Sequence, residues 1–150
     1  MALATLGRRV LALEEEAEHL DELLAELVHQ VAPDLLDVYG VGVDTAAVLL
    51  AAAGDNPERL HSEAAFARLC GVAPLPATSG KTSNRHRLNR GGDRQANQAL
   101  WRIVMTRMRF DPRTREYVER RTKEGLSKRE VMRVLKRYVA REVYRHIPRG

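Results

Sequence analysis

An apolar heptad repeat near the N-terminus constrains the fold more than any other feature of the sequence. Its members alternate three and four positions apart over about four heptads: Leu3, Leu6, Val10, Leu13, Ala17, Leu20, Leu24, Leu27 and Val31. A single helix cannot bury such a seam. The seam must therefore pack against a second copy of the chain or against a later helix of the same chain, in an antiparallel hairpin. Both arrangements stay open, and the helix is expected to end near Ala32, before Pro33.

The composition favours one helical domain. The chain has 150 residues, of which 44% are hydrophobic and only 5% aromatic. This length supports a core of moderate size, and the shortage of aromatic residues disfavours an all-β design. No run of about 18 apolar residues suggests a membrane span, and the single Cys70 fits a reducing compartment. We therefore expect an all-α protein that lies in the cytoplasm and has no membrane partner.

The charged residues divide the chain into an acidic and a basic half. Residues 1–75 contain 4 basic and 13 acidic side chains, a net charge of −9. Residues 76–150 contain 21 basic and 7 acidic side chains, a net charge of +14. A surplus of this kind, mostly arginine, favours a phosphate-rich partner through bidentate contacts and counterion release. The alternative is a solvated helical surface, but the local bias favours nucleic acid.

Two helices joined by a glycine-containing turn are expected over residues 35–54. The sequence Tyr39-Gly40-Val41-Gly42-Val43 separates two apolar stretches, a pattern that resembles a helix-hairpin-helix motif. Glycines permit a sharp turn, and the next helix then offers backbone N–H groups and a positive dipole to a phosphate. The alternative is a tight helix connection that binds nothing.

A basic loop is expected over residues 77–92, because this segment lacks apolar periodicity and is rich in Ser, Thr, Gly and Asn. The following helix, expected from Asp93 to about Arg109, anchors it to the core. His86 is the one titratable group of the loop near neutral pH. The candidate nucleic-acid contacts are Gly40, Gly42, Gly80, Lys81, Arg85, Arg87, Arg90 and Arg94.

Two more helices are expected at the C-terminal end. Asp111-Pro112 begins one and Gly125 ends it, and a capping box from Ser127 to Glu130 begins the last. In the last helix the apolar residues and Tyr138 are expected to face inward, and the basic residues, including Lys136, mostly outward. Trp101 is expected in the core in preference to stacking on a base. The histidines are scattered, so we expect no metal site and no cofactor in this chain.

The order of residues in the loop and the helix after it resembles one transposase family. T-S-G-K followed by R-H-R-L-N-R-G-G-D-R-Q-A-N-Q-A-L is similar to the signature of the IS 110 / IS 116 / IS 902 type of insertion-sequence transposases, which are bridge-RNA-guided serine recombinases. The similarity covers roughly residues 35–145. It implies that Ser79, in a Ser-Gly pair with Gly80, is the catalytic nucleophile, with Ser83 as the alternative.

The same resemblance implies partners and a second domain. Members of this family carry an N-terminal nuclease-like domain with acidic metal ligands, which nothing in this sequence matches. Mg²⁺ is implied only where that domain is present. The expected partners are DNA, a guide RNA, and either a second copy bound through residues 3–31 or a full-length transposase.

We therefore expect a coiled-coil helix over residues 1–32 and a helical transposase domain over residues 33–150, the basic C-terminal helices covering 93–147. The expected function is DNA strand cleavage and exchange through a serine nucleophile, by a truncated chain that is inactive alone. The alternative is a non-catalytic DNA- or RNA-binding module derived from a transposase.

Overall fold

A computed structural model describes residues 1–76, 86–87 and 91–148 of the chain. Seven α-helices, one short 3-10 helix and one two-stranded ladder occur within these ranges. The fold is all-α, as the composition predicted, because the two strands contribute only two residues each. In this described part of the chain, no helix is long and apolar enough to cross a bilayer.

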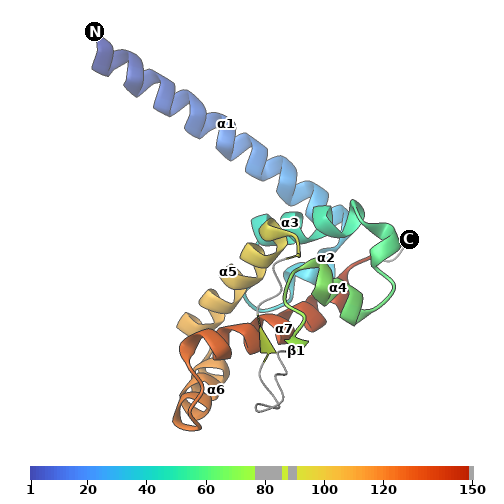
Figure 1. Ribbon diagram of the computed structural model, residues 1–150. Coiled ribbons are helices and arrows are strands. Elements are labelled where there is room, and N and C mark those ends of the chain that lie inside the picture. Colours follow the sequence, from blue (N-terminus) through green and yellow to red (C-terminus); the bar gives the residue numbers. More distant parts are fainter. Residues whose placement is uncertain (77–85, 88–90, 149–150) are drawn as a thin grey trace.

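Helix α1, Ala2–Val31, projects away from the other helices (Figure 1). Val28 is its buried residue, and the side chains of Leu6, Leu13 and Leu20 are each more than half exposed. Helix α1 packs on α2 and α3. No described helix runs antiparallel along the heptad seam, so the intrachain hairpin that the seam allowed is wrong for this part of the chain.

Helices α2, Pro33–Leu36, and α3, Val43–Gly54, follow a sharp change of direction. Helix α1 ends at Val31, as predicted, and Pro33 occupies the first position of α2, where its missing N–H costs nothing. The turn between α2 and α3 contains Gly40 and Gly42. Helix α3 lies across the end of α1 and packs mainly against α5.

A short irregular region connects α3 to the basic loop. It contains the 3-10 helix η1, Pro57–Arg59, and helix α4, Glu63–Leu69. Ser62 caps α4, because its Oγ accepts a hydrogen bond from the Ala65 N–H at 3.1 Å. Strands β1, Leu75–Pro76, and β2, His86–Arg87, then pair antiparallel.

The basic half of the chain forms three helices: α5, Arg94–Phe110; α6, Pro112–Lys123; and α7, Lys128–His146. Their N-termini confirm the predicted caps. Asp93 Oδ1 accepts from the Ala96 N–H at 2.9 Å, and Asp111 caps α6 ahead of Pro112. Ser127 and Glu130 form the capping box of α7.

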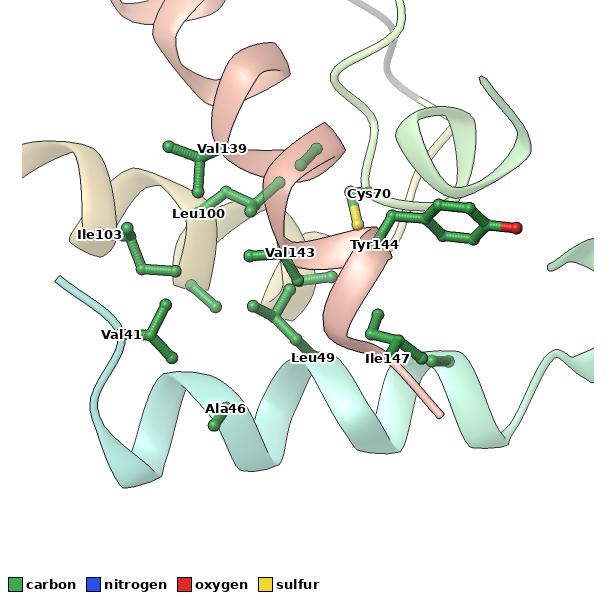
Figure 2. Close-up of a cluster of buried hydrophobic side chains, with 14 of the residues drawn as sticks. Val41, Ala46, Leu49, Cys70, Leu100, Ile103, Val139, Val143, Tyr144 and Ile147 are labelled. Carbon is green, nitrogen blue, oxygen red and sulfur yellow. The ribbon is translucent and has the colours of Figure 1, made fainter. Parts of the chain in front are cut away.

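The core lies where α3, α5 and α7 meet (Figure 2). Its fully buried side chains include Leu49 from α3, Leu100 and Ile103 from α5, and Val139 and Val143 from α7. Each such side chain contributes about 1.5–3 kcal/mol on burial. Burial of residues from α3, α5 and α7 together makes a rigid platform that carries both the glycine turn and the base of the basic loop.

Three side chains of this platform differ from their predicted positions. The Trp101 side chain is 43% exposed, because Leu100, Ile103 and Val104 fill the inward face of α5. Tyr138 is also exposed and packs edge-on against Tyr117 of α6, with ring centroids 6.3 Å apart. Lys136 was expected outward but is only 8% exposed, since its ammonium reaches an acceptor on α5.

Candidate functional site

The two ends of the basic loop are fixed at one place, where α4 ends and α5 begins. The Asp93 backbone N–H donates a hydrogen bond to the Leu69 carbonyl at 2.7 Å. Gly92 lies directly on the backbone of Gly71, so that a Cβ on Gly92 would be 2.3 Å from the Gly71 Cα. Only glycine permits so close an approach. The chain before the loop, at Leu69 and Gly71, and the chain after it, at Gly92 and Asp93, are thus held together where α4 ends and α5 begins.

The β1–β2 ladder adds a second fixed point inside the loop. Leu75 pairs with Arg87, and Pro76 pairs with His86. Residues 77–85, which include Ser79, Gly80, Lys81 and Arg85, connect these paired strands and lie outside the described residues. Arg90 also lies outside them. The segment that carries Ser79 therefore begins after Pro76 and ends before His86, two residues whose backbones are paired.

A pair of polar side chains, Asn97 of α5 and Lys136 of α7, fastens the loop base; we refer to this pair as the loop latch. The Asn97 Nδ2 donates to the carbonyls of Cys70, at 2.9 Å, and Gly71, at 3.3 Å. The Lys136 Nζ donates to Asn97 Oδ1 at 2.9 Å. The ammonium therefore fixes the orientation of the amide, and the amide holds the end of α4 against α5.

The loop latch places a buried amine close to the loop base. Burial lowers the pKa of the Lys136 ammonium below its usual 10.5, and repulsion from Arg133 lowers it further. Its acceptor is a neutral amide, and none of the ion pairs among the described residues uses Lys136. The adjacent Cys70 is a poor nucleophile, because burial, with a smaller effect from Asp93, raises the pKa of its thiol to about 12.

The glycine turn between α2 and α3 is docked on α5. Gly40 has a φ of 84°, and a Cβ there would lie 3.2 Å from the Ile103 carbonyl oxygen. The Arg107 Nε donates to the Tyr39 carbonyl at 2.8 Å, and the same guanidinium pairs with Glu142 of α7 at 2.9 Å. Gly40 is therefore required by the fold itself, through its backbone conformation and its packing.

Gly42 is not required in this way. Its φ of −103° suits any residue, and a Cβ built on it would meet nothing within 4 Å. Its backbone N–H is already engaged, since it donates to the Thr45 Oγ1 at 3.0 Å. The Gly42 amide is therefore engaged within the chain, whereas the open space over Gly42 permits close approach of a ligand; phosphate binding at the start of α3 stays a prediction.

A surface groove of about 580 Å³ opens beside Gly42 and is lined by Asp21, Gly40, Val41, Gly42, Val43, Asp44, Thr45, Arg102 and Thr106. Its charges are mixed. Arg102 pairs with Asp44 at 3.7 Å, and both side chains are more than half exposed. An ion pair this exposed contributes little, so its arginine can exchange partners.

The predicted contacts thus fall into three groups. The structure brings Gly40 and Gly42 together at the groove, and it places Arg94, which is exposed, in the first turn of α5 beside the loop base. Arg87 belongs to β2, where the backbone is described. Ser79, Gly80, Lys81, Arg85 and Arg90 lie outside the described residues, as does Ser83.

Sequence reasoning missed Asn97, Lys136 and Arg107. Asparagine is a weak helix former, so its position inside an expected helix was a usable signal for Asn97. Lys136 and Arg107 carried no such signal, because nothing local distinguishes them from the other cations on their helices. Within the described ranges, no three His, Cys, Asp or Glu side chains gather closely enough to hold a metal ion.

Comparison with known proteins identifies the family. Residues 32–119 match the model of the transposase IS116/IS110/IS902 family. The chain is 32% identical over 122 residues to a 43.6 kDa protein of insertion element IS110 from Streptomyces coelicolor, a match that covers 80% of this chain. It is 33% identical over 120 residues, 79% of the chain, to a 42 kDa protein of insertion element IS900 from Mycobacterium paratuberculosis.

These matches cover different shares of the proteins compared. The chain spans only 30% of the length of either curated relative, whereas the family model covers more than half of the chain. The matched segment runs from the end of α1 into α6, and it includes the glycine turn, the basic loop and Asn97. The chain belongs to the IS116/IS110/IS902 family of transposases.

Proposed function

We propose that this chain is the DNA-binding portion of an insertion-sequence transposase and that Ser79 supplies the nucleophile for strand cleavage and exchange. The observation that carries the proposal is the anchoring of the loop at both ends. Asp93, Gly92 and the loop latch hold its base against the buried helices. A nucleophile on such a loop is supported by a rigid scaffold, as the positioning of reacting groups requires.

The charge distribution supports a DNA partner. Residues 76–150 contain 21 basic side chains, and the ion pairs between described residues use Arg102, Arg107, Arg121, Lys123 and Arg145. Among the described residues 91–148, most of the arginines form none of these ion pairs and remain for other partners. Neutralising phosphates releases the counterions condensed on DNA, which drives binding without regard to sequence.

The proposed chemistry is a transesterification at phosphorus. The Ser79 Oγ attacks, a Ser79 Oγ–P bond forms, and the bond from phosphorus to the leaving sugar oxygen breaks. The serine proton must go to a base, and the leaving oxygen must gain a proton. Lys81, Arg85, Arg87 and Arg90 are close to Ser79 in sequence and supply cations that stabilise the developing charge.

We propose that the base for this chemistry comes from outside this chain. His86 is the only loop group that titrates near neutral pH, and the described residues offer no cluster of carboxylates. We therefore propose that a separate acidic domain, and a guide RNA that pairs with the target, complete the recombinase. This chain alone then binds DNA without cleaving it.

A non-catalytic DNA- or RNA-binding module is the second candidate. The observation that favours it is the surplus of basic side chains in residues 76–150, which can bind nucleic acid whether or not Ser79 reacts. In this reading the arginine surplus binds nucleic acid and Ser79 has no chemical role. The two candidates make the same prediction for affinity and opposite predictions for a covalent intermediate.

We also propose that α1 joins two copies of the chain or joins this chain to a complete transposase. The heptad leucines of α1 are exposed, and the helix projects from the domain (Figure 1). A helix of this length with an unpaired apolar seam gains stability by packing against a second helix. Val28, near the C-terminal end of α1, is buried against the domain. The rest of the heptad seam, toward the N-terminus, is available for that contact.

A covalent trap tests the serine directly. The chain is mixed with the acidic domain of a related transposase, its guide RNA, Mg²⁺ and radiolabelled target DNA, and denaturing electrophoresis then detects protein bound to the label. We expect an adduct that Ser79→Ala abolishes, with DNA affinity kept within about threefold, because one hydroxyl in a polar loop contributes about 1 kcal/mol or less.

The control substitution in this trap is Ser83→Ala, which should leave the adduct intact. An adduct that persists in Ser79→Ala and disappears in Ser83→Ala would transfer the nucleophile to Ser83. An adduct that survives both substitutions would exclude the serine chemistry and leave the binding module.

A further inference from the structure

The solvent side of α5 combines apolar and cationic side chains. Residues that share this side recur at helical spacing, and we call them the α5 face: Arg94, Gln98, Trp101, Met105 and Arg109. Trp101 is 43% exposed and Met105 is 42% exposed. Trp101 is also the one tryptophan of the chain. Two large apolar side chains exposed four positions apart, with arginines on either side, suit a binding surface.

The charges of α5 indicate what that partner is. The helix contains four arginines and neither Asp nor Glu. Arg102, next to Trp101, has one weak, exposed pair with Asp44. A partner that meets this surface must therefore be anionic and must also present a flat apolar group to the indole. A nucleic acid strand has both properties, because it alternates phosphates with aromatic bases.

Helix α5 also connects the two parts of the candidate site. Arg94 lies beside the loop base, and Arg102 lines the groove at Gly42. Arg109, at the far end, lies over the exposed Phe110 ring at 5.2 Å. From Arg94 to Arg109 the helix extends about 22 Å, which accommodates several nucleotides.

We propose that the α5 face binds an unpaired stretch of nucleic acid, with the Trp101 indole stacked on one base and Arg94 and Arg109 on flanking phosphates. In a duplex, neighbouring bases cover each base face, so an indole on a helix surface reaches a base only where the strand is unpaired. This inference deepens the proposed DNA-binding function and rests on it. It states that helix α5 binds an unpaired strand in preference to a duplex.

Tryptophan fluorescence tests the contact in the intact chain. The emission of Trp101 is measured with iodide as quencher while single-stranded oligothymidylate, or a duplex of equal length, is added. We expect saturating single strand to reduce the emission and to shield Trp101 from iodide, whereas the duplex leaves iodide quenching close to its initial value.

Matched substitutions separate stacking from charge, with affinity measured by anisotropy of a labelled oligonucleotide. Trp101→Leu should weaken single-strand binding by about 5- to 100-fold, and Trp101→Phe by about threefold or less, because phenylalanine keeps a stacking face. The salt dependence should be unchanged in Trp101→Leu, whereas Arg109→Gln should reduce its log–log slope by about one. Tyr138→Leu, which removes an exposed aromatic ring from α7, is the control and should have no such effect.

Several results would overturn this inference. Unchanged iodide quenching at saturating single strand, or equal affinity of Trp101→Leu and the parent chain, would exclude stacking. Equal shielding by duplex would exclude the unpaired strand. If Trp101 becomes shielded from iodide as protein concentration rises, before any nucleic acid is added, the α5 face binds a second copy of the chain instead. A chain that binds no oligonucleotide would refute this inference together with the DNA-binding function, whereas binding that spares Trp101 refutes the inference alone.

Discussion

Gly40 and Gly42 lie two positions apart, and the structure gives them different constraints. Gly40 has a positive φ and lies against the backbone of α5, so it faces the core. Gly42 has an ordinary extended conformation and faces open space. A sequence cannot distinguish these cases, because both are simply glycines in a turn. The distinction decides which of the two is available to a ligand.

Substitutions at these glycines should separate stability from binding. Gly40→Ala should lower the free energy of unfolding by about 1–3 kcal/mol, from the unfavourable φ and the contact with Ile103, as denaturant titration would measure. Gly42→Val should cost about 1 kcal/mol or less, as a weaker helix cap, but should reduce DNA affinity by blocking close approach.

Gly54→Val is the control for Gly42→Val, since Gly54 ends the same helix and also faces open space. It should leave DNA affinity unchanged. Equal affinities of the Gly42→Val and Gly54→Val variants would mean that the turn does not contact DNA.

The loop latch gives a second prediction, for which the buried thiol of Cys70 is a natural probe. Asn97→Leu removes both hydrogen bonds to the α4 carbonyls and leaves the Lys136 ammonium without its acceptor. The loop base should then open more often, and the labelling rate of Cys70 by a thiol reagent should rise about 5- to 10-fold.

Arg141→Met, which removes an exposed cation from the same helix as Lys136, is the control and should leave the Cys70 labelling rate unchanged. If Asn97→Leu also leaves that rate at the parent value, the loop latch does not hold the loop base.

At the scale of elements, local signals predicted more than tertiary ones. The caps Ser62, Asp93, Asp111 and Ser127, and the end of α1 before Pro33, follow from residues within one helical turn of each boundary. The helix that packs against the α1 seam could not be predicted from the sequence. A heptad pattern specifies an apolar stripe but leaves the identity of the second helix open.

Helix α1 therefore predicts self-association. Leu13→Lys with Leu20→Lys should dissociate an assembly formed through the heptad seam, because each change places a charge in the apolar contact. Both side chains are more than half exposed in the single chain, so the stability of the monomer should be unaffected. Sedimentation of the parent and the double variant at micromolar concentration measures this, and a monomeric parent would contradict the prediction.

At the scale of the whole molecule, the division of charge connects the sequence to the function. The acidic half forms α1 and the turn region, and the basic half forms the loop and α5, α6 and α7. This division, the all-α fold and the family were predictable from the sequence. The burial of Lys136 and the exposure of Trp101 were not, since each depends on which side chains fill the packed helix faces around it.

The salt dependence of DNA binding by this chain tests the central claim most directly, because it needs no other component. If the basic half neutralises about six phosphates, the log of the association constant should fall with the log of salt concentration with a slope of about −5. Fluorescence anisotropy of a labelled DNA from low to physiological salt measures the slope. A steep, linear decrease is the predicted result, and an affinity that does not change with salt would contradict the account.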